Sequence, residues 1–294
     1  METDVLIIGS GPAGIQAAIH ASRKKASVAV AGRTSASAAS GTEMDNYFGT
    51  GPVSGDELLS HGVSQAESTG ARFLGENVIA AGRRGDAFEF TLEGGESVTS
   101  KAVVIATGIS RRKLGIPGEK ELFGKGVSYC AVCDCNFYRG RRAVIVGNDS
   151  EAAVSAEMMT GFASETSWVV WDLQASDVLF DKAVAAGVRI LRSKPKAILG
   201  ESAVEALELE DGTVVPTDGV FIELGARSAA DIAMDLDVMP EMDDTIKVDA
   251  GCATGVPGVF ACGDVTGRPW QVAKAVGQGC VAGMNAAAYA RGER

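Results

Sequence analysis

The chain has 294 residues, and 27 Lys and Arg against 38 Asp and Glu give a formal net charge of −11. Its length and its 46% hydrophobic, 22% charged composition indicate about two globular domains and exclude a largely disordered chain. The acidic balance argues against nucleic acid and anionic membranes as partners, and we find no apolar run near the ~18 residues of a membrane span.

The first elements form a strand–turn–helix–strand unit. The start, METDVLIIG, is a buried strand rather than a signal peptide, so we expect a cytoplasmic protein. Strands are predicted at 4–9 and 27–32, with a helix at 11–25 between them. The turn carries a GxGxxG motif, whose glycines permit a tight turn, close approach of a pyrophosphate and close helix packing. The predicted dinucleotide-binding residues are Gly9, Ser10, Gly11, Pro12, Ala13 and Gly14.

Two later segments favour FAD as this dinucleotide. After a loop at 34–55 and a helix at 56–70, strands at 86–92 and 102–106 lead into Thr107 and Gly108. Near the end of the chain, the glycine-rich segment 247–264 ends in Gly263-Asp264. An acid brought back beside the first loop can accept hydrogen bonds from the ribityl hydroxyls of a flavin, although an ordinary turn aspartate is the alternative.

The middle of the chain repeats the first unit. Residues 111–126 are Gly- and Lys-rich and mark a domain boundary, and a second strand–turn–helix–strand pattern follows at 141–171. An Ala-rich helix at 269–290 closes the chain. Two copies of one supersecondary unit predict an α/β protein with two Rossmann-like, doubly wound domains.

Three of the six cysteines crowd into residues 130–135. Cys130 and Cys133 form a CxxC followed by Asp134, a spacing typical of a redox dithiol in a cytosolic protein. A helix N-terminus can activate one thiol, and the acid can move a proton to and from the thiolate. Structural zinc is the alternative, but neither His20 nor His61 lies at finger spacing, so we predict no metal site.

These motifs together resemble the low-molecular-weight thioredoxin reductases. GSGPAG, ATG, CAVCD between two glycine loops, and TGVPGVFACGD occur in that family's order along nearly the whole chain. The resemblance implies a homodimer whose FAD domain comprises residues 1–112 and 246–294. It also implies an inserted NADPH-domain-like unit at 113–245 that carries the redox pair and rotates to present it alternately to the flavin and a partner.

The resemblance also implies roles for individual residues. Cys133 would face the flavin, Cys130 would attack the partner's disulfide, and Asp134 would be the acid–base group. Trp270 stands where the family has an arginine, which removes a fixed charge beside the flavin and adds an aromatic face. The other FAD contacts it implies are Glu43, Asn46, Val78 through its backbone at the adenine, Thr107, Gly108, Gly263, Asp264, Gln271 and Val272.

The second glycine loop departs from the family pattern Gly-x-Gly-x-x-Ala. Asp149 replaces the middle glycine, so its side chain would obstruct and repel a pyrophosphate. The following strand ends in Val170-Trp171-Asp172, where the family has a His-Arg-Arg cluster for the 2′-phosphate. We therefore predict that NADPH is not used, and that ferredoxin, a second flavin or another redox partner exchanges the electrons.

A second dinucleotide remains an alternative at this loop. Asp172 lies near the distance expected for a ribose-binding acid, so Gly147, Trp171 and Asp172 are its predicted contacts, either for NADH or for a second FAD. Tryptophans beside both nucleotide regions, Trp171 and Trp270, favour the diflavin-linked disulfide oxidoreductases. Trp168 and Trp171 point to opposite faces of one strand, so at least one is expected in the core.

We therefore expect an FAD enzyme that exchanges electrons with the Cys130–Cys133 disulfide and then with thioredoxin or another external thiol partner. Relative potentials decide the direction. One alternative is an NADPH-dependent thioredoxin reductase, and another, from a different class, is a non-enzymatic redox sensor. Cys135 is either an alternative disulfide partner or a small packed residue.

Overall fold

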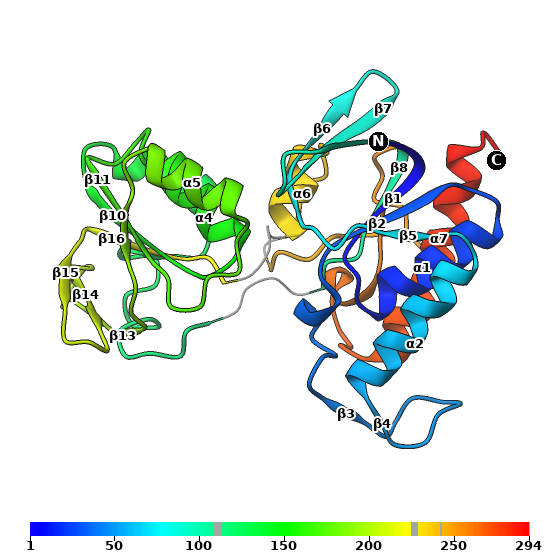
Figure 1. The fold of residues 1–294 in the computed structure, drawn as a ribbon, viewed down its shortest axis with the longest axis horizontal. Helices are drawn as coiled ribbons and strands as arrows, with labels where there is room; N and C mark the ends of the chain where they lie inside the picture. The colour runs from blue at the N-terminus through cyan, green and yellow to red at the C-terminus, as the bar shows by residue number, and fades with distance from the viewer. Residues whose placement is uncertain (109–112, 225–228, 242, 294) are drawn as a thin grey trace. The chain divides into compact units, whose positions relative to one another are not determined.

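The structure is a computed structural model that describes residues 1–108, 113–224, 229–241 and 243–293 (Figure 1). The chain divides into two compact units, Met1–Ile109 with Arg227–Arg294 and Ser110–Ala226, so the second is inserted into the first along the sequence. Among the described residues, no helix is both long enough and apolar enough to cross a membrane.

The first unit is built on a seven-stranded sheet in the order β5-β2-β1-β8-β7-β6, with β17 beside β8. β1, β2, β5, β8 and β17 are parallel, whereas β6 and β7 add an antiparallel hairpin. The strands are β1 (Glu2–Ile8), β2 (Val28–Ala31), β5 (Arg72–Phe73), β6 (Val78–Arg84), β7 (Ala87–Leu92), β8 (Ser97–Ile105) and β17 (Val259–Ala261).

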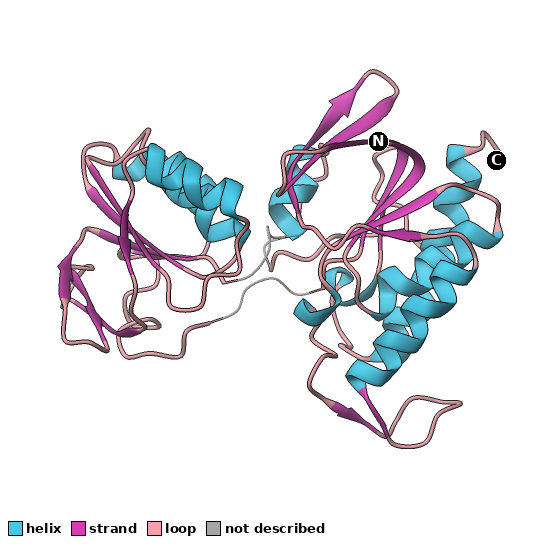
Figure 2. Ribbon diagram, in the orientation of Figure 1, coloured by secondary structure: helices cyan, strands magenta, loops and turns pink. Residues whose placement is uncertain are grey.

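Apolar layers cover both faces of this sheet, which explains the unbroken apolar run VLII in β1. On one face, α1 (Pro12–Arg23) packs against both α2 (Gly55–Ser68) and α7 (Val272–Ala290), as Figure 2 shows. On the other face, Phe88 and Phe90 of the hairpin share a cluster with α6 (Ala229–Asp235). The short β3 (Glu43–Met44) and β4 (Val53–Ser54) form a separate ribbon.

The second crossover between units comes earlier than we predicted. We placed it at 245/246, whereas the structure assigns the chain from Arg227 onward to the first unit. Ile232, Leu236 and Val238 are the reason, because they lie in the same buried cluster as Leu6 of β1.

The second unit contains a five-stranded parallel sheet in the order β12-β11-β10-β16-β9. An antiparallel sheet of β13, β14 and β15 shares a buried cluster with β10 and β16. The helical elements of this unit are α3 (Ala131–Asp134), η2 (Cys135–Tyr138), α4 (Ser150–Met159) and α5 (Asp177–Ala185). The strands are β9 (Val127–Ser128), β10 (Arg142–Val146), β11 (Glu165–Val169), β12 (Arg189–Leu191), β13 (Pro195–Leu199), β14 (Ala206–Leu209), β15 (Val214–Pro216) and β16 (Gly219–Ile222).

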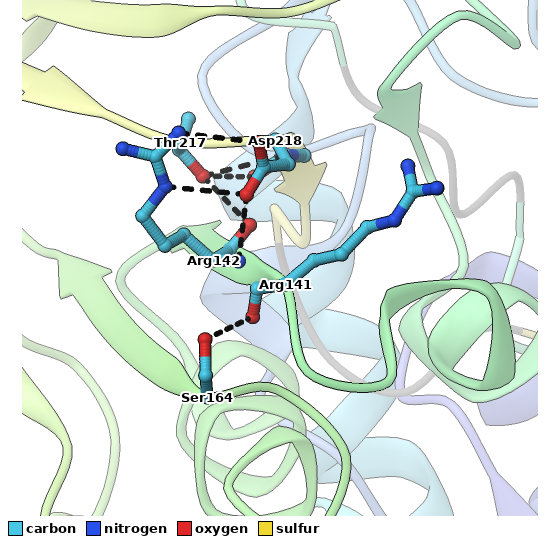
Figure 3. A network of polar contacts seen from close by, with 6 residues as sticks. Arg141, Arg142, Ser164, Thr217 and Asp218 are labelled. Atoms are coloured by element: carbon cyan, nitrogen blue, oxygen red, sulfur yellow. Dashed lines mark hydrogen bonds and ion pairs between the residues drawn. The ribbon is translucent and has the colours of Figure 1, made fainter.

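A polar network ties the amino ends of this sheet together (Figure 3). Asp218, just before β16, accepts hydrogen bonds from the Arg142 backbone N–H (2.8 Å) and from its guanidinium (3.2 Å). Ser164, just before β11, donates to the Arg141 carbonyl at 3.1 Å. These contacts fix β10, β11 and β16 at one edge, so the loops after their carboxyl ends lie at the other. The predicted α/β class with two doubly wound units is confirmed.

Candidate active site

The first glycine loop joins β1 to α1, and two glycines in it leave no room for a side chain. Gly9 has a φ of +115°, and a Cβ there would lie 2.2 Å from the carbonyl oxygen of Ala106. A Cβ at Gly14 would lie 1.8 Å from the carbonyl oxygen of Gly9. Among the described residues, a Cβ at Gly11 would meet only the Ser37 side chain, 3.1 Å away at Oγ. The loop therefore packs tightly while the backbone at Gly11 stays open to a ligand.

The same loop presents the start of α1 to that open side. Gly11 is the N-cap of α1, and no side chain of the described residues caps the helix there. The first N–H groups of a helix have no partner within it, and its dipole attracts negative charge. Ser10, Pro12 and Ala13 lie in this loop and in the first turn, where the motif predicted them. The arrangement fits a pyrophosphate.

Three side-chain oxygen atoms around the loop are buried without a hydrogen-bond partner among the described residues. They are Ser10 through Oγ, Thr107 through Oγ1 and Asp264 through Oδ1. These residues follow β1, β8 and β17, whose last residues are paired in register, so all three lie at one sheet edge. A buried polar group without a partner costs about 1–3 kcal/mol. Their hydroxyl and carboxylate groups suit a ligand that carries both hydroxyls and phosphates, and FAD is such a ligand.

Contacts from α7 hold the turn that carries Asp264. Gln278 Oε1 accepts hydrogen bonds from Gly263 N (3.0 Å) and Thr266 Oγ1 (2.9 Å). Lys274 Nζ donates to the Gly263 carbonyl at 3.0 Å. Burial raises the pKa of Asp264, and the charge of Lys274 partly offsets that rise. Burial lowers the pKa of Lys274, which the negative charge of Asp264 counteracts. The carboxyl is thus held in a site that penalises its charge until a donor binds it.

Residues predicted to lie by the flavin ring meet at the start of α7. Asn46 Nδ2 donates to Gln271 Oε1 at 3.1 Å, which joins two predicted positions far apart in sequence. Val272 is the first residue of α7. Trp270 is 45% exposed, and the Arg268 guanidinium lies 4.1 Å from its ring centroid in a cation–π contact. Sequence analysis missed Arg268, which lies two residues before position 270, where the family has its arginine.

The other predicted FAD contacts lie in different surroundings. Glu43 is exposed in β3, and Gly108 has a φ of +73° directly after Thr107. The Val78 side chain is in the core, so only its backbone could meet a ligand. Sequence analysis also missed Arg33, which follows β2 and forms an ion pair with buried Glu93.

In the second unit, Cys130 and Cys133 form a disulfide with a Cα–Cα distance of 5.3 Å. Cys130 is the N-cap of α3 and is buried, whereas Cys133 is exposed. Ser128 Oγ accepts a hydrogen bond from Cys130 N (3.1 Å) and donates to Asp134 Oδ2 (2.7 Å). Cys135 is a buried free thiol that contacts the Val132 carbonyl, in keeping with a packed residue. The predicted dithiol pair and acid are therefore adjacent.

A glutamate that the sequence did not single out lies against this pair. Glu223 follows β16 and is only 7% exposed, and its Oε1 accepts a hydrogen bond of 2.7 Å from Ala131 N in α3. A Cβ at Gly147 would lie 1.9 Å from the Glu223 carbonyl oxygen. Glu223 therefore connects the redox helix with the second glycine loop.

That loop is closed by its own polar contacts. Asn148 Oδ1 accepts hydrogen bonds from Trp171 N (3.0 Å) and Asp172 N (3.1 Å), which ties it to the segment after β11. Trp168 is fully buried and its Nε1 donates to the Gly147 carbonyl at 2.8 Å, so it is the expected core tryptophan. Trp171 is half-buried and packs on the core of the unit, and Asp172 is exposed.

Four acidic residues gather at the carboxyl ends of this sheet. Asp149 is the N-cap of α4, and Glu151 lies in its first turn and is 6% exposed. Asp172 follows β11 and Glu223 follows β16. Carboxyl ends of parallel strands beside a glycine loop are where such folds bind dinucleotides. Here that edge carries four carboxyl groups, which disfavour a pyrophosphate where they are ionised.

Comparisons with known proteins find relatives along nearly the whole chain. The sequence profile of the pyridine nucleotide-disulphide oxidoreductases matches residues 3–279. The thioredoxin reductase of Aquifex aeolicus is 34% identical over 306 aligned residues, which cover 99% of this chain and 94% of that protein.

Two solved structures are similar along nearly the whole chain. The atypical thioredoxin reductase TRi from Desulfovibrio vulgaris Hildenborough is 33% identical with a TM-score of 0.81, covering 99% of this chain and 98% of that one. A ferredoxin-flavin thioredoxin reductase from Clostridium acetobutylicum is 32% identical with a TM-score of 0.66, covering 97% of each chain.

Proposed function

The chain belongs to the pyridine nucleotide-disulphide oxidoreductase family, and from this we propose an FAD-dependent, thioredoxin-reductase-like enzyme that does not use NADPH. Membership makes it a flavin-dependent disulfide oxidoreductase that acts on sulfur groups. The proposal adds that the Cys130–Cys133 pair exchanges electrons with the flavin and with an external dithiol or disulfide such as that of thioredoxin. It further includes a cytoplasmic homodimer.

Because buried oxygen atoms of the first unit without a described partner lie around Gly11, we assign FAD to this sheet edge. The N-terminus of α1 would bind the pyrophosphate, Ser10 and Thr107 would bind hydroxyl or phosphate oxygens, and Asp264 would accept hydrogen bonds from hydroxyls. Asn46, Gln271 and Trp270 would lie by the ring, with the remaining predicted contacts around them. When bound, FAD supplies two-electron chemistry at its ring, and the chain supplies binding and orientation.

At the redox pair, the chain's residues handle bonds and protons. Two electrons break the S–S bond and leave one thiolate and, after uptake of one proton, one thiol. Asp134, held by Ser128, is the proposed proton carrier. Cys133 is assigned to the flavin and Cys130 to the partner. Because Cys130 is the buried sulfur of the pair, this assignment requires that engagement of the partner exposes it.

One observation carries NADPH independence: Asp149 stands at the N-cap of α4, where the family pattern needs a glycine against the pyrophosphate. Buried Glu151 and Glu223 place two further carboxyl groups at the same edge. A titration calorimetry experiment with NADPH is expected to show no saturable heat up to millimolar concentrations. Saturable binding would favour the NADPH-dependent alternative.

The proposed electron donor or acceptor is then ferredoxin, a second flavin or another redox protein. The ferredoxin-flavin enzyme among the similar structures supports the first. Trp171 and Asp172, beside Gly147, would contact a second FAD. FAD released per polypeptide on denaturation separates the two, because one equivalent supports a protein donor and two support the diflavin enzyme.

Anaerobic reduction by a dithiol tests whether the pair works as an enzyme's redox centre. Dithiothreitol is expected to bleach the oxidised flavin in the wild type, and Cys133→Ser is expected to slow this by orders of magnitude. Unchanged flavin–thiol exchange in Cys133→Ser would instead support a redox sensor whose cysteines only switch a binding surface.

A further inference from the structure

The redox disulfide has a buried carboxylate beside it that the proposed reaction does not use. Glu223 is 7% exposed, and its Oε1 accepts the N–H of Ala131 at 2.7 Å. Ala131 is 1% exposed and directly follows Cys130 in the chain. The contact therefore brings an acid from the end of β16 to the first residue of α3.

Covalent geometry limits how far this carboxylate lies from the sulfur. Four bonds separate Cys130 Sγ from Ala131 N, so these atoms are within about 5 Å of each other. The Glu223 oxygen is therefore within about 8 Å of Cys130 Sγ. At that separation in a protein-like dielectric, two negative charges disfavour each other by roughly tenfold or more.

We propose that Glu223 lowers the reduction potential of the Cys130–Cys133 pair by disfavouring the thiolate at Cys130. Reduction adds two electrons, breaks the S–S bond and creates negative charge on sulfur, next to a charge that is already there. Glu223 is thus a positioning residue that acts through Cys130, and this role rests on the proposed redox function of the pair.

Other ionisable groups on the surrounding elements belong in the same electrostatic account. Asp134 lies in α3 itself, and Tyr138 lies in η2, which follows α3 directly. Glu151 lies in the first turn of α4, which packs against α3. Glu223 contacts the backbone of α3 directly, because its Oε1 accepts the Ala131 N–H.

The test compares the wild type with Glu223→Gln, which keeps an oxygen for the Ala131 N–H and removes only the charge. The holoenzyme is equilibrated with dithiothreitol redox buffers, quenched and alkylated, and the fraction of reduced Cys130 and Cys133 is counted by mass spectrometry. The variant is expected to be reduced about tenfold more readily, which is about 30 mV in potential. In a Cys133→Ser background, the pH midpoint of Cys130 alkylation is expected to fall by about one unit.

Asp218→Asn is the matched control, because it removes the same charge at the other end of the same strand. Asp218 directly precedes β16 and Glu223 directly follows it, a separation of about 16 Å along an extended strand. Its potential is expected to equal that of the wild type. If Glu223→Gln does not fold, as judged by FAD content and circular dichroism, the neutral Glu223→Met is measured instead.

The proposal fails if the neutral variants keep the wild-type potential and alkylation profile, or if Asp218→Asn shifts them equally. Such a result leaves the proposed function intact, because the equilibrium with dithiothreitol does not depend on the electron donor. A wild-type pair that cannot be reduced at all would instead contradict the proposed function.

Discussion

Two alanine substitutions, Gly14→Ala and Gly11→Ala, separate packing from cofactor binding in the first glycine loop. Gly14→Ala places a Cβ 1.8 Å from the Gly9 carbonyl oxygen, so β1 and α1 must move apart. Gly11→Ala places its Cβ near only Ser37 among the described residues, and Gly11 has a φ of −82°, which alanine adopts freely. The same chemical change is therefore a packing defect at one position and a ligand defect at the other.

The expected magnitudes differ accordingly. Overpacking by one methyl group costs about 1–3 kcal/mol, so Gly14→Ala should lower the free energy of unfolding by at least that amount. Gly11→Ala should change it by no more than about 0.5–1 kcal/mol, because the new side chain meets no backbone. A Cβ between Gly11 and a pyrophosphate removes close hydrogen bonds to a charged group, each worth about 1.5–3 kcal/mol. FAD affinity should fall roughly 10- to 100-fold.

Urea unfolding of the apoproteins measures the first quantity, and quenching of flavin fluorescence on titration with FAD measures the second. Gly11→Ala is expected to unfold like the wild type and to bind FAD weakly. Wild-type FAD affinity in Gly11→Ala would refute the placement of the pyrophosphate at this loop. Wild-type stability in Gly14→Ala would refute the close packing of β1 and α1.

Three further predictions concern charge and sulfur. Burial raises the pKa of Asp264, so ionisation of Asp264 destabilises the native apoprotein increasingly as pH rises above about 4. Asp264→Asn should remove this loss of stability, measured by urea titrations at pH 4 and pH 7, and should weaken FAD binding. An unchanged pH dependence of stability would contradict this prediction. Cys133→Ser should accumulate a mixed disulfide with oxidised thioredoxin after reduction, detected on non-reducing gels, whereas Cys130→Ser should not; the reverse pattern would exchange the two roles. The hydrogen bond from Arg142 lowers the pKa of Asp218, so this pair stabilises the native state above about pH 4, and the stabilisation is lost as pH falls further. Asp218→Asn should lower the free energy of unfolding by at most about 1 kcal/mol near neutral pH and should not change it in strong acid.

Local patterns predicted the parts of the fold that depend on neighbours in sequence. The strand, glycine turn and helix around Gly9 follow from apolar residues and glycines within one short segment, and the helix lies at Pro12–Arg23 against a predicted 11–25. The CxxC pair likewise needed only its own spacing, and it forms the disulfide. β6, in contrast, was missed because VIAAGRR lacks the alternation that marks a half-buried strand.

The contacts that sequence reasoning missed join residues far apart in the chain. Glu223 reaches Ala131 across 92 positions, and nothing in the segment GVFIELG marks its glutamate as a neighbour of a cysteine. The same holds for Asn148, whose side chain closes the second glycine loop onto Trp171. The second crossover was misplaced because α6 is a seven-residue helix whose apolar side chains find their cluster only in the folded unit.

The central claim is that this disulfide oxidoreductase does not take electrons from NADPH. Anaerobic stopped-flow mixing of the holoenzyme with excess NADPH, followed at the absorbance of the oxidised flavin, tests it most directly. We predict no bleaching on the time scale of catalysis, while dithiothreitol bleaches the same sample through Cys130 and Cys133. Rapid bleaching by NADPH would contradict the account, because it would require a pyrophosphate to bind beside Asp149.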